Sequence, residues 1–190
     1  MTAGLLEELA DVGYPVASVA DLRSSGGRYR AAVPVLLRWL DRSEDIFEKE
    51  EIVRALSVPW ARGEALGPLI ELFRSVSFGG HELQLLRWAV GNALEVLWDD
   101  SRFEELVELA RDESYGKARE MVVLGLGRSK KPEAGGVAIE LLEDPVVSGH
   151  AVKALRRLKD PQARNGLQRM LDDERAWVRK EAQRALAALG

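Results

Sequence analysis

A short pattern recurs five times along the chain, and each copy ends in a leucine. The leucines are Leu56, Leu94, Leu124, Leu155 and Leu186, spaced 38, 30, 31 and 31 residues apart. The residue before each leucine is alanine or valine, and a basic residue stands seven positions earlier in four of the five copies. Self-similarity at a nearly fixed period is typical of repeat architectures, so each copy is expected to be one structural unit.

Each copy is predicted to consist of two short amphipathic helices. A second pattern precedes each leucine segment, as in "PLIELFRS", "FEELVELARD" and "VAIELLED", with apolar residues three and four positions apart. Neither helix buries its apolar face alone, so neighbouring copies must stack. No segment alternates with period two, so no strand is expected. The predicted helices cover residues 31–41, 46–58, 65–77, 81–98, 101–111, 114–127, 132–143, 146–158, 162–172 and 174–189.

The first 30 residues do not match the repeat. They contain two helical segments, "LLEELADVG" and "VASVADLRS". Repeat arrays need atypical end units that cover an exposed apolar face. Residues 1–30 are therefore predicted to be an N-terminal helical cap, with a specialised partner-binding head as the alternative. Residues 31–190 would hold about five helix pairs, and 1–190 would form a single domain.

The segment "LQRMLDDERAWVRKEAQRALAAL" resembles a HEAT repeat, of the short kind similar to the HEAT-like repeats of phycobilin lyases. The resemblance implies an all-α fold, a right-handed α-α superhelix of the HEAT-like solenoid type. It also implies that an acid in the turn and a following basic residue tie adjacent units together. The matching residues are Asp172 or Asp173 with Arg179, and Asp112 with Lys117.

Trp177 raises a separate question, because four basic residues surround it in "DDERAWVRKEAQRAL". Its place in the repeat, with Leu85 and Tyr115 as counterparts, favours packing on the buried side of the last unit or at its end. A platform that stacks on a ligand is the alternative.

Composition excludes several classes of function. The chain has no cysteine, which rules out disulfides, thiolate catalysis and cysteine-bound metals. Only His81 and His150 are present, and no spacing suggests a catalytic triad, a metal site or a phosphate loop, so neither catalysis nor a cofactor is expected. No apolar run is long enough to cross a bilayer, and the N-terminus lacks the basic start of a signal peptide. A cytoplasmic protein is expected.

The remaining candidate is the surface formed by the second helices, which in HEAT-type arrays line one face. Its character changes along the chain from acidic to apolar to basic. An aromatic anchor with charged flanks suits a protein- or peptide-binding groove. Burial of Trp88 between neighbouring helices is the alternative interpretation. The predicted partner-binding residues are Trp88, Asn92, Met121, Lys153, Arg156, Lys180 and Arg184.

The sequence thus predicts a non-catalytic scaffold for a protein or peptide, with an acidic, amphipathic segment as the matching partner. The net charge of −4 argues against nucleic acid, although residues 128–190 hold 13 Lys and Arg against 9 Asp and Glu. The alternative is a nucleic-acid binder or a HEAT-like DNA glycosylase. It would use the basic residues of the last two repeats, Lys153, Arg156, Arg157, Lys180 and Arg184. Assistance in cofactor or bilin attachment is a third possibility by family analogy.

Overall fold

The computed structural model describes residues 3–76 and 79–190. Over these residues the backbone forms α-helices, short 3₁₀ segments and turns, and it forms no strand. The predicted all-α class is therefore confirmed. The chain divides into two compact units, Met1–Leu97 and Trp98–Gly190, each of which is built from paired helices.

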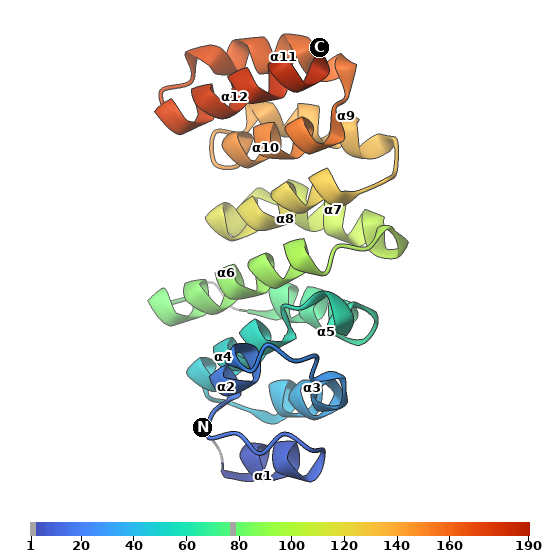
Figure 1. Cartoon of the computed structure of the whole chain (residues 1–190). Helices are drawn as coiled ribbons and strands as arrows, with labels where there is room; N and C mark the ends of the chain where they lie inside the picture. The colour runs from blue at the N-terminus through green and yellow to red at the C-terminus, as the bar shows by residue number, and fades with distance from the viewer. Residues whose placement is uncertain (1–2, 77–78) are drawn as a thin grey trace. The chain divides into compact units, whose positions relative to one another are not determined.

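Over its described residues, 3–76 and 79–97, the first unit holds six α-helices (Figure 1). They are α1 (Ala3–Asp11), α2 (Val19–Ser24), α3 (Val33–Arg42), α4 (Ile46–Leu56), α5 (Arg62–Ser75) and α6 (His81–Val96). The pairs α3/α4 and α5/α6 stack so that first helix packs on first helix and second on second. The helix predicted over 65–77 begins earlier, at Arg62, and its predicted end at residue 77 lies outside the described residues.

The segment before the repeats forms a further pair of helices. Helix α1 packs on α3, and α2 packs on α4. The Arg38 guanidinium donates to the Glu8 carboxylate at 2.8 Å, and the buried Tyr29 hydroxyl donates to the Ala55 carbonyl oxygen at 2.8 Å. Residues 1–2 of the predicted cap lie outside the described part of the chain. The assignment of residues 1–190 to one domain stays a prediction.

The second unit also holds six helices. They are α7 (Phe103–Arg111), α8 (Glu120–Gly125), α9 (Glu133–Glu140), α10 (Ser148–Leu158), α11 (Arg164–Arg169) and α12 (Ala176–Leu189). The pairs are α7/α8, α9/α10 and α11/α12, and the second helices α8, α10 and α12 pack in succession, as can be followed in Figure 1. Several α-helices are extended by 3₁₀ turns, for example Pro161–Ala163 before α11 and Met170–Asp172 after it.

The leucines that mark the repeat lie in the core. Leu56, Leu94 and Leu155 are fully buried, and Leu124 is nearly so. Leu186, in the last helix, is partly exposed. The small residues before the leucines, including Ala154 and Ala185, are fully buried as well. The periodicity of the sequence therefore identified the face that each second helix turns inward.

A basic residue near the start of three second helices caps the helix before it. The guanidinium groups of Arg87, Arg119 and Arg179 donate to the carbonyl oxygens of Phe73 (3.3 Å), Ala110 (3.0 Å) and Asp173 (2.7 Å). The last carbonyls of an α-helix have no partner within the helix, so these bonds satisfy groups that would otherwise be buried without one. Two members of the basic column, Arg87 and Arg179, thus bind a main-chain carbonyl of the preceding segment, and Arg119 does the same two residues after the column position of its copy.

The third copy departs from the prediction of one helix over residues 114–127. Residues Glu113–Arg119 form a 3₁₀ segment instead, and α8 begins only at Glu120. Gly116 within that segment has φ 53°, a left-handed conformation that glycine adopts without steric cost. Because of the turn at Gly116, α8 begins at Glu120 rather than at the predicted residue 114.

This turn moves the register of the third copy by two residues. Arg119 rather than the exposed Lys117 performs the capping. Correspondingly, Leu126, which is fully buried, aligns with Leu94 in place of Leu124. Four positions before the leucine, the sequence alignment has an apolar residue in the other copies (Ile52, Val90, Ala151, Ala182) but Glu120 in the third, and with the shift the fully buried Val122 takes that position. The shift explains why an acid interrupted an apolar column in the sequence.

The tie predicted between Asp172 or Asp173 and Arg179 is formed differently. The Asp173 carboxylate accepts from the guanidinium of Arg175 at 2.8 and 2.9 Å, whereas Arg179 binds backbone oxygens. Arg175 also donates to the Pro145 carbonyl at 2.8 Å and to the Ser148 hydroxyl at 2.6 Å. Arg175 therefore links the last two helix pairs. The looser pairing of Asp112 with Lys117 is replaced by a bond from the Ser114 N–H to Asp112 at 3.0 Å.

Candidate protein-binding surface

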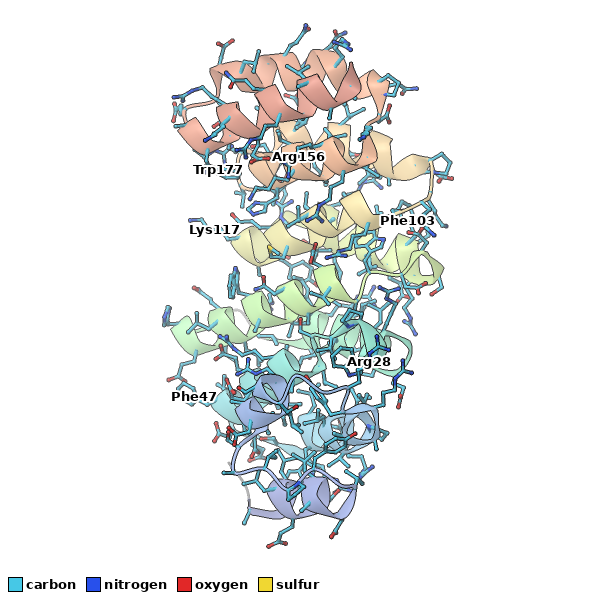
Figure 2. All side chains as sticks on the ribbon, viewed as in Figure 1. Arg28, Phe47, Phe103, Lys117, Arg156 and Trp177 are labelled. Carbon is cyan, nitrogen blue, oxygen red and sulfur yellow. The ribbon has the colours of Figure 1, made fainter. Side chains whose placement is uncertain are left out.

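Exposed large apolar side chains gather on the second helices. Within the helix-pair repeats, they are Phe47 on α4, Leu85 and Trp88 on α6, and Trp177 on α12. Among the described residues of the first helices α3, α5, α7, α9 and α11, no large apolar side chain is exposed to the same degree. Figure 2 labels Phe47 on the first unit and Trp177 on the second. The second helices therefore carry the apolar surface that is open to a partner.

In the first unit, Trp88 borders a hollow. Its side chain is 44% exposed, which rules out the interpretation that it is buried between neighbouring helices. The hollow has a volume of about 290 Å³ and is lined by Arg23, Arg54, Ser57, Trp88, Ala89 and Asn92. The predicted residues Trp88 and Asn92 thus share one recess, and the Asn92 amide donates to the Trp88 carbonyl oxygen at 2.9 Å.

The charges around this hollow are balanced. Arg23 pairs with Glu51 at 3.1 Å, and Arg54 pairs with Glu50 at 2.5 Å. Both arginines line the recess together with Trp88, so the hollow offers guanidinium donors beside an aromatic ring. Sequence reasoning missed Arg23, because it lies in the segment outside the repeat.

In the second unit, the structure places the other five predicted residues on α8, α10 and α12. They are Met121, Lys153, Arg156, Lys180 and Arg184. Met121 is half-buried, whereas Lys180 is exposed.

Two of these cations are already paired with one carboxylate. The Glu181 oxygens lie 3.2 Å from the Arg156 guanidinium and 2.5 Å from that of Arg184. The Glu181 side chain is largely buried, so its charge is held between the two arginines. The basic end of the face is therefore weaker than the sequence suggests, with Lys153 and Lys180 as its main positive charges.

Trp177 does not lie on the buried side of the last repeat. It is 41% exposed, and its counterparts Leu85 and Tyr115 are also exposed or half-buried. The reason is its position as the second residue of α12, where the ring rests against α10. A Cβ atom added at Gly149 of α10 would lie 2.2 Å from the indole Cη2, so the missing side chain provides the space for the ring.

Charged groups surround this indole. The Lys153 Nζ lies 4.8 Å from the ring centroid, and the Arg175 guanidinium carbon lies 5.9 Å from it. Both distances fall within the range of cation–π attraction. The His150 ring stands edge-on at 5.7 Å between centroids.

Burial and positive neighbours change the protonation of this cluster. Burial, followed by the charges of Lys153 and Arg175, lowers the pKa of His150 to about 4. His150 is therefore neutral at neutral pH. Burial raises the pKa of Glu120, and the charges of Lys117, Arg175 and Lys153 partly oppose that effect.

We expect the free energy of unfolding to fall as the pH is lowered from about 6.5 to about 4, in part because of His150. In this window the unfolded chain takes up a proton on the imidazole and the folded chain does not, so protons favour unfolding. Urea denaturation across the window should show a smaller loss for His150→Gln than for wild type. Carboxylates titrate in both proteins and cancel in the comparison. Identical pH profiles would contradict the burial of a neutral histidine.

The described residues do not assemble a group of side chains suited to hold a metal ion. Over residues 3–76 and 79–190, no group of three or more His, Asp or Glu side chains could hold a metal ion. His81 begins α6 in the first unit, and His150 belongs to α10 in the second, so they occupy separate units. In the same part of the chain, no helix has the length and apolar character needed to cross a membrane.

Comparison with known proteins identifies the repeat. A family profile of HEAT repeats matches residues 103–187, which span α7 to most of α12. No curated protein matches the chain. HEAT repeats commonly act as scaffolds for protein interactions, and their all-α fold is typically non-catalytic. The match covers the three helix pairs of the second unit, α7/α8, α9/α10 and α11/α12, and this segment of the chain is similar to HEAT repeats.

Proposed function

We propose that the chain is a non-catalytic scaffold that binds a protein or peptide through the second helices of its repeats. The observation that carries this proposal is the distribution of exposed apolar side chains. Within the repeats, Phe47, Leu85, Trp88 and Trp177 all belong to second helices. Exposed aromatic residues contribute disproportionately to protein interfaces, because they bury a large area at a small cost in conformational entropy.

Trp88 is the proposed anchor in the first unit. Its ring borders a recess of about 290 Å³ together with Asn92, which supplies a polar group beside the aromatic surface. An apolar side chain of the partner would enter beside the ring, and the guanidinium groups of Arg23 and Arg54 would face its polar neighbours. Recesses that combine an aromatic wall with a few polar groups favour specific binding over non-specific hydrophobic binding.

The basic residues of the last repeats favour an acidic, amphipathic partner. Residues 148–190 contain ten Lys and Arg against five Asp and Glu, so this part of the chain attracts negative charge. Lys153, Arg156, Lys180 and Arg184 are the contributors on the second helices, and Met121 would add apolar contact. Charges of this kind mainly speed association and select the partner, while the aromatic anchors hold it.

The proposal predicts that Trp88→Ala will abolish capture of the natural partner. Tagged wild-type protein and variants would be used to isolate proteins from the native host, followed by quantitative mass spectrometry. Truncation of a central aromatic anchor commonly costs about 2 kcal/mol or more, which is about 30-fold in affinity. The control is Glu64→Ala, an exposed change on the first helix α5. The same unfolding temperature in both variants excludes a folding defect. A partner that Glu64→Ala releases and Trp88→Ala retains would place binding on the other face.

Nucleic acid is the alternative ligand that this experiment must exclude. Arg156 and Arg184 share Glu181, which leaves few free cations for a row of phosphate contacts. Single- and double-stranded DNA and RNA should therefore leave the thermal unfolding of the protein unchanged at moderate salt. A tight affinity that falls steeply as salt rises, and that Lys180→Glu with Arg184→Glu removes, would instead support the nucleic-acid function.

A further inference from the structure

The second unit carries an aromatic and cationic cluster at the start of α12. Its members are Trp177, Lys153, Arg175 and the neutral His150, contributed by α10, by α12 and by the residue before α12. Trp177 is 41% exposed although its ring packs on Gly149. One part of the indole is thus fixed by the protein, and the rest remains open to solvent.

The two cations of the cluster differ in how firmly they are held. Arg175 is fixed by the Asp173 carboxylate, the Pro145 carbonyl and the Ser148 hydroxyl, all within 2.9 Å. Its charge is therefore largely balanced by Asp173. Lys153 forms no ion pair within 4 Å among the described residues, and its ammonium lies 4.8 Å from the indole centroid. An ammonium group without a close ion pair therefore lies beside an exposed apolar surface, and the half-buried Glu120 carboxylate is near enough to interact with its charge.

Repulsion excludes a positively charged ligand. A lysine or arginine of a partner that approached Trp177 would meet Lys153 and Arg175 at close range, in a part of the chain that is rich in Lys and Arg. A purely apolar ligand would cover the indole but would remove water from the Lys153 ammonium without replacing it, which costs free energy. A ligand that meets both needs must join an apolar group to a carboxylate.

We propose that Trp177, Lys153 and Arg175 form a second docking site, which takes an Asp or Glu side chain next to an apolar residue in a segment of a protein partner. The apolar residue covers the indole, and the carboxylate pairs with the Lys153 ammonium. The Arg175 guanidinium lies over the ring, 5.9 Å from its centroid, and helps to hold the indole in place. The inference rests on the proposed scaffold function, but it concerns a site in the other unit from Trp88 and has its own chemical requirement.

The test is a selection of random peptides displayed on phage against the full chain. Peptides that bind wild type are sequenced and sorted by whether they still bind Trp177→Ala or Trp88→Ala. We expect the peptides that require Trp177 to be enriched in Asp or Glu adjacent to Leu, Ile, Phe or Trp. The enriched consensus, labelled with a fluorophore, then serves as the probe for affinity measurements by fluorescence anisotropy.

The variants separate the parts of the site. Trp177→Ala should weaken binding of the consensus peptide by about 30-fold or more, as loss of an aromatic anchor does. Gly149→Ala should weaken it in the same direction without changing any charge, because the new methyl group displaces the ring. Lys153→Gln should weaken it by about fivefold and flatten its salt dependence. Lys153→Arg should largely restore both. The matched control is Lys130→Gln, which removes an exposed positive charge of the same unit in the segment before α9.

Four outcomes would overturn the inference. Peptides that require Trp177 but show no preference for acids would disprove the carboxylate site and leave the scaffold function intact. If every selected peptide requires Trp88 and none requires Trp177, the site at Trp177 is disproved, whereas the scaffold function is supported. Single-stranded DNA that binds more tightly than the consensus peptide, and is lost with Trp177→Ala, would assign the cluster to nucleic acid. If wild type enriches no peptide beyond the Trp88→Ala, Trp177→Ala double variant, the scaffold function itself fails.

Discussion

Arg119→Ala should lower the free energy of unfolding by about 3–5 kcal/mol, as the loss of one partner of a buried ion pair commonly does. The Arg119 side chain is almost completely buried and pairs with the Asp144 carboxylate. It also donates to the Ala110 carbonyl oxygen at 3.0 Å. Truncation would leave a partly buried carboxylate without its countercharge and a helix-end carbonyl without a donor. Urea unfolding of the full chain, followed by circular dichroism, measures the loss.

Arg111→Ala provides the matched control in the same unit. Arg111 and Glu140 form an ion pair at 2.6 Å, and both side chains are about half exposed. Exposed pairs contribute about 0–1 kcal/mol, because water solvates both charges well when they separate. Arg119→Lys should fall between the two, since an ammonium keeps the charge but lacks the planar fork that binds two acceptors. Equal losses for Arg119→Ala and Arg111→Ala would show that burial of the Arg119 pair adds nothing to stability.

The positions of most helices could be predicted from the sequence. For example, the helices predicted over 146–158 and 174–189 extend over Ser148–Leu158 and Ala176–Leu189 in the structure. The reason is physical: a helix that packs on one side must place apolar residues every three or four positions, and that pattern is visible without coordinates. Stacking of similar units then follows, because no pair can bury its own apolar face.

The third repeat shows where this reasoning stops. A glycine within a helical pattern is compatible with a helix, and periodicity alone does not reveal that Gly116 takes a left-handed conformation. The turn at Gly116 delays α8 and shifts the register by two residues. Glu120 was the visible sign of that shift, because an acid in an apolar column is inconsistent with the simple alignment. Alignment on the capping arginines would have given Arg119 and Leu126 instead.

The candidate site was predictable only in part. The sequence predicted that Trp88 and Lys153 belong to the second helices of their repeats, and both lie on second helices in the structure. It did not show that Trp177 is exposed, because that depends on space left by Gly149, 28 positions earlier in the chain. Nor did it show which cations are free, since Arg156 and Arg184 are paired only because both reach Glu181. Features that depend on contacts between repeats are not encoded in the pattern within one repeat.

Leu155→Ala should destabilise the second unit by about 2–5 kcal/mol, as the removal of buried methyl groups and the resulting cavity commonly do. Leu155 is fully buried in α10, which packs against α8, α9 and α12, so the surrounding helices cannot all move to fill the space. Lys153→Ala, two residues earlier on the same helix, should change the free energy of unfolding by no more than about 0.5 kcal/mol. The Lys153 side chain lies at the surface and is only partly buried, so its truncation leaves no cavity in the core.

The same measurement also tests the register of the third repeat. Leu126 is fully buried, whereas Leu124 retains 9% of its accessible surface. If the turn at Gly116 shifts the repeat by two residues, Leu126 is the true counterpart of Leu155, and Leu126→Ala should cost more than Leu124→Ala. A larger loss for Leu124→Ala would restore the alignment with a constant spacing. In that case the capping by Arg119 would be a local replacement rather than a shift of the whole helix.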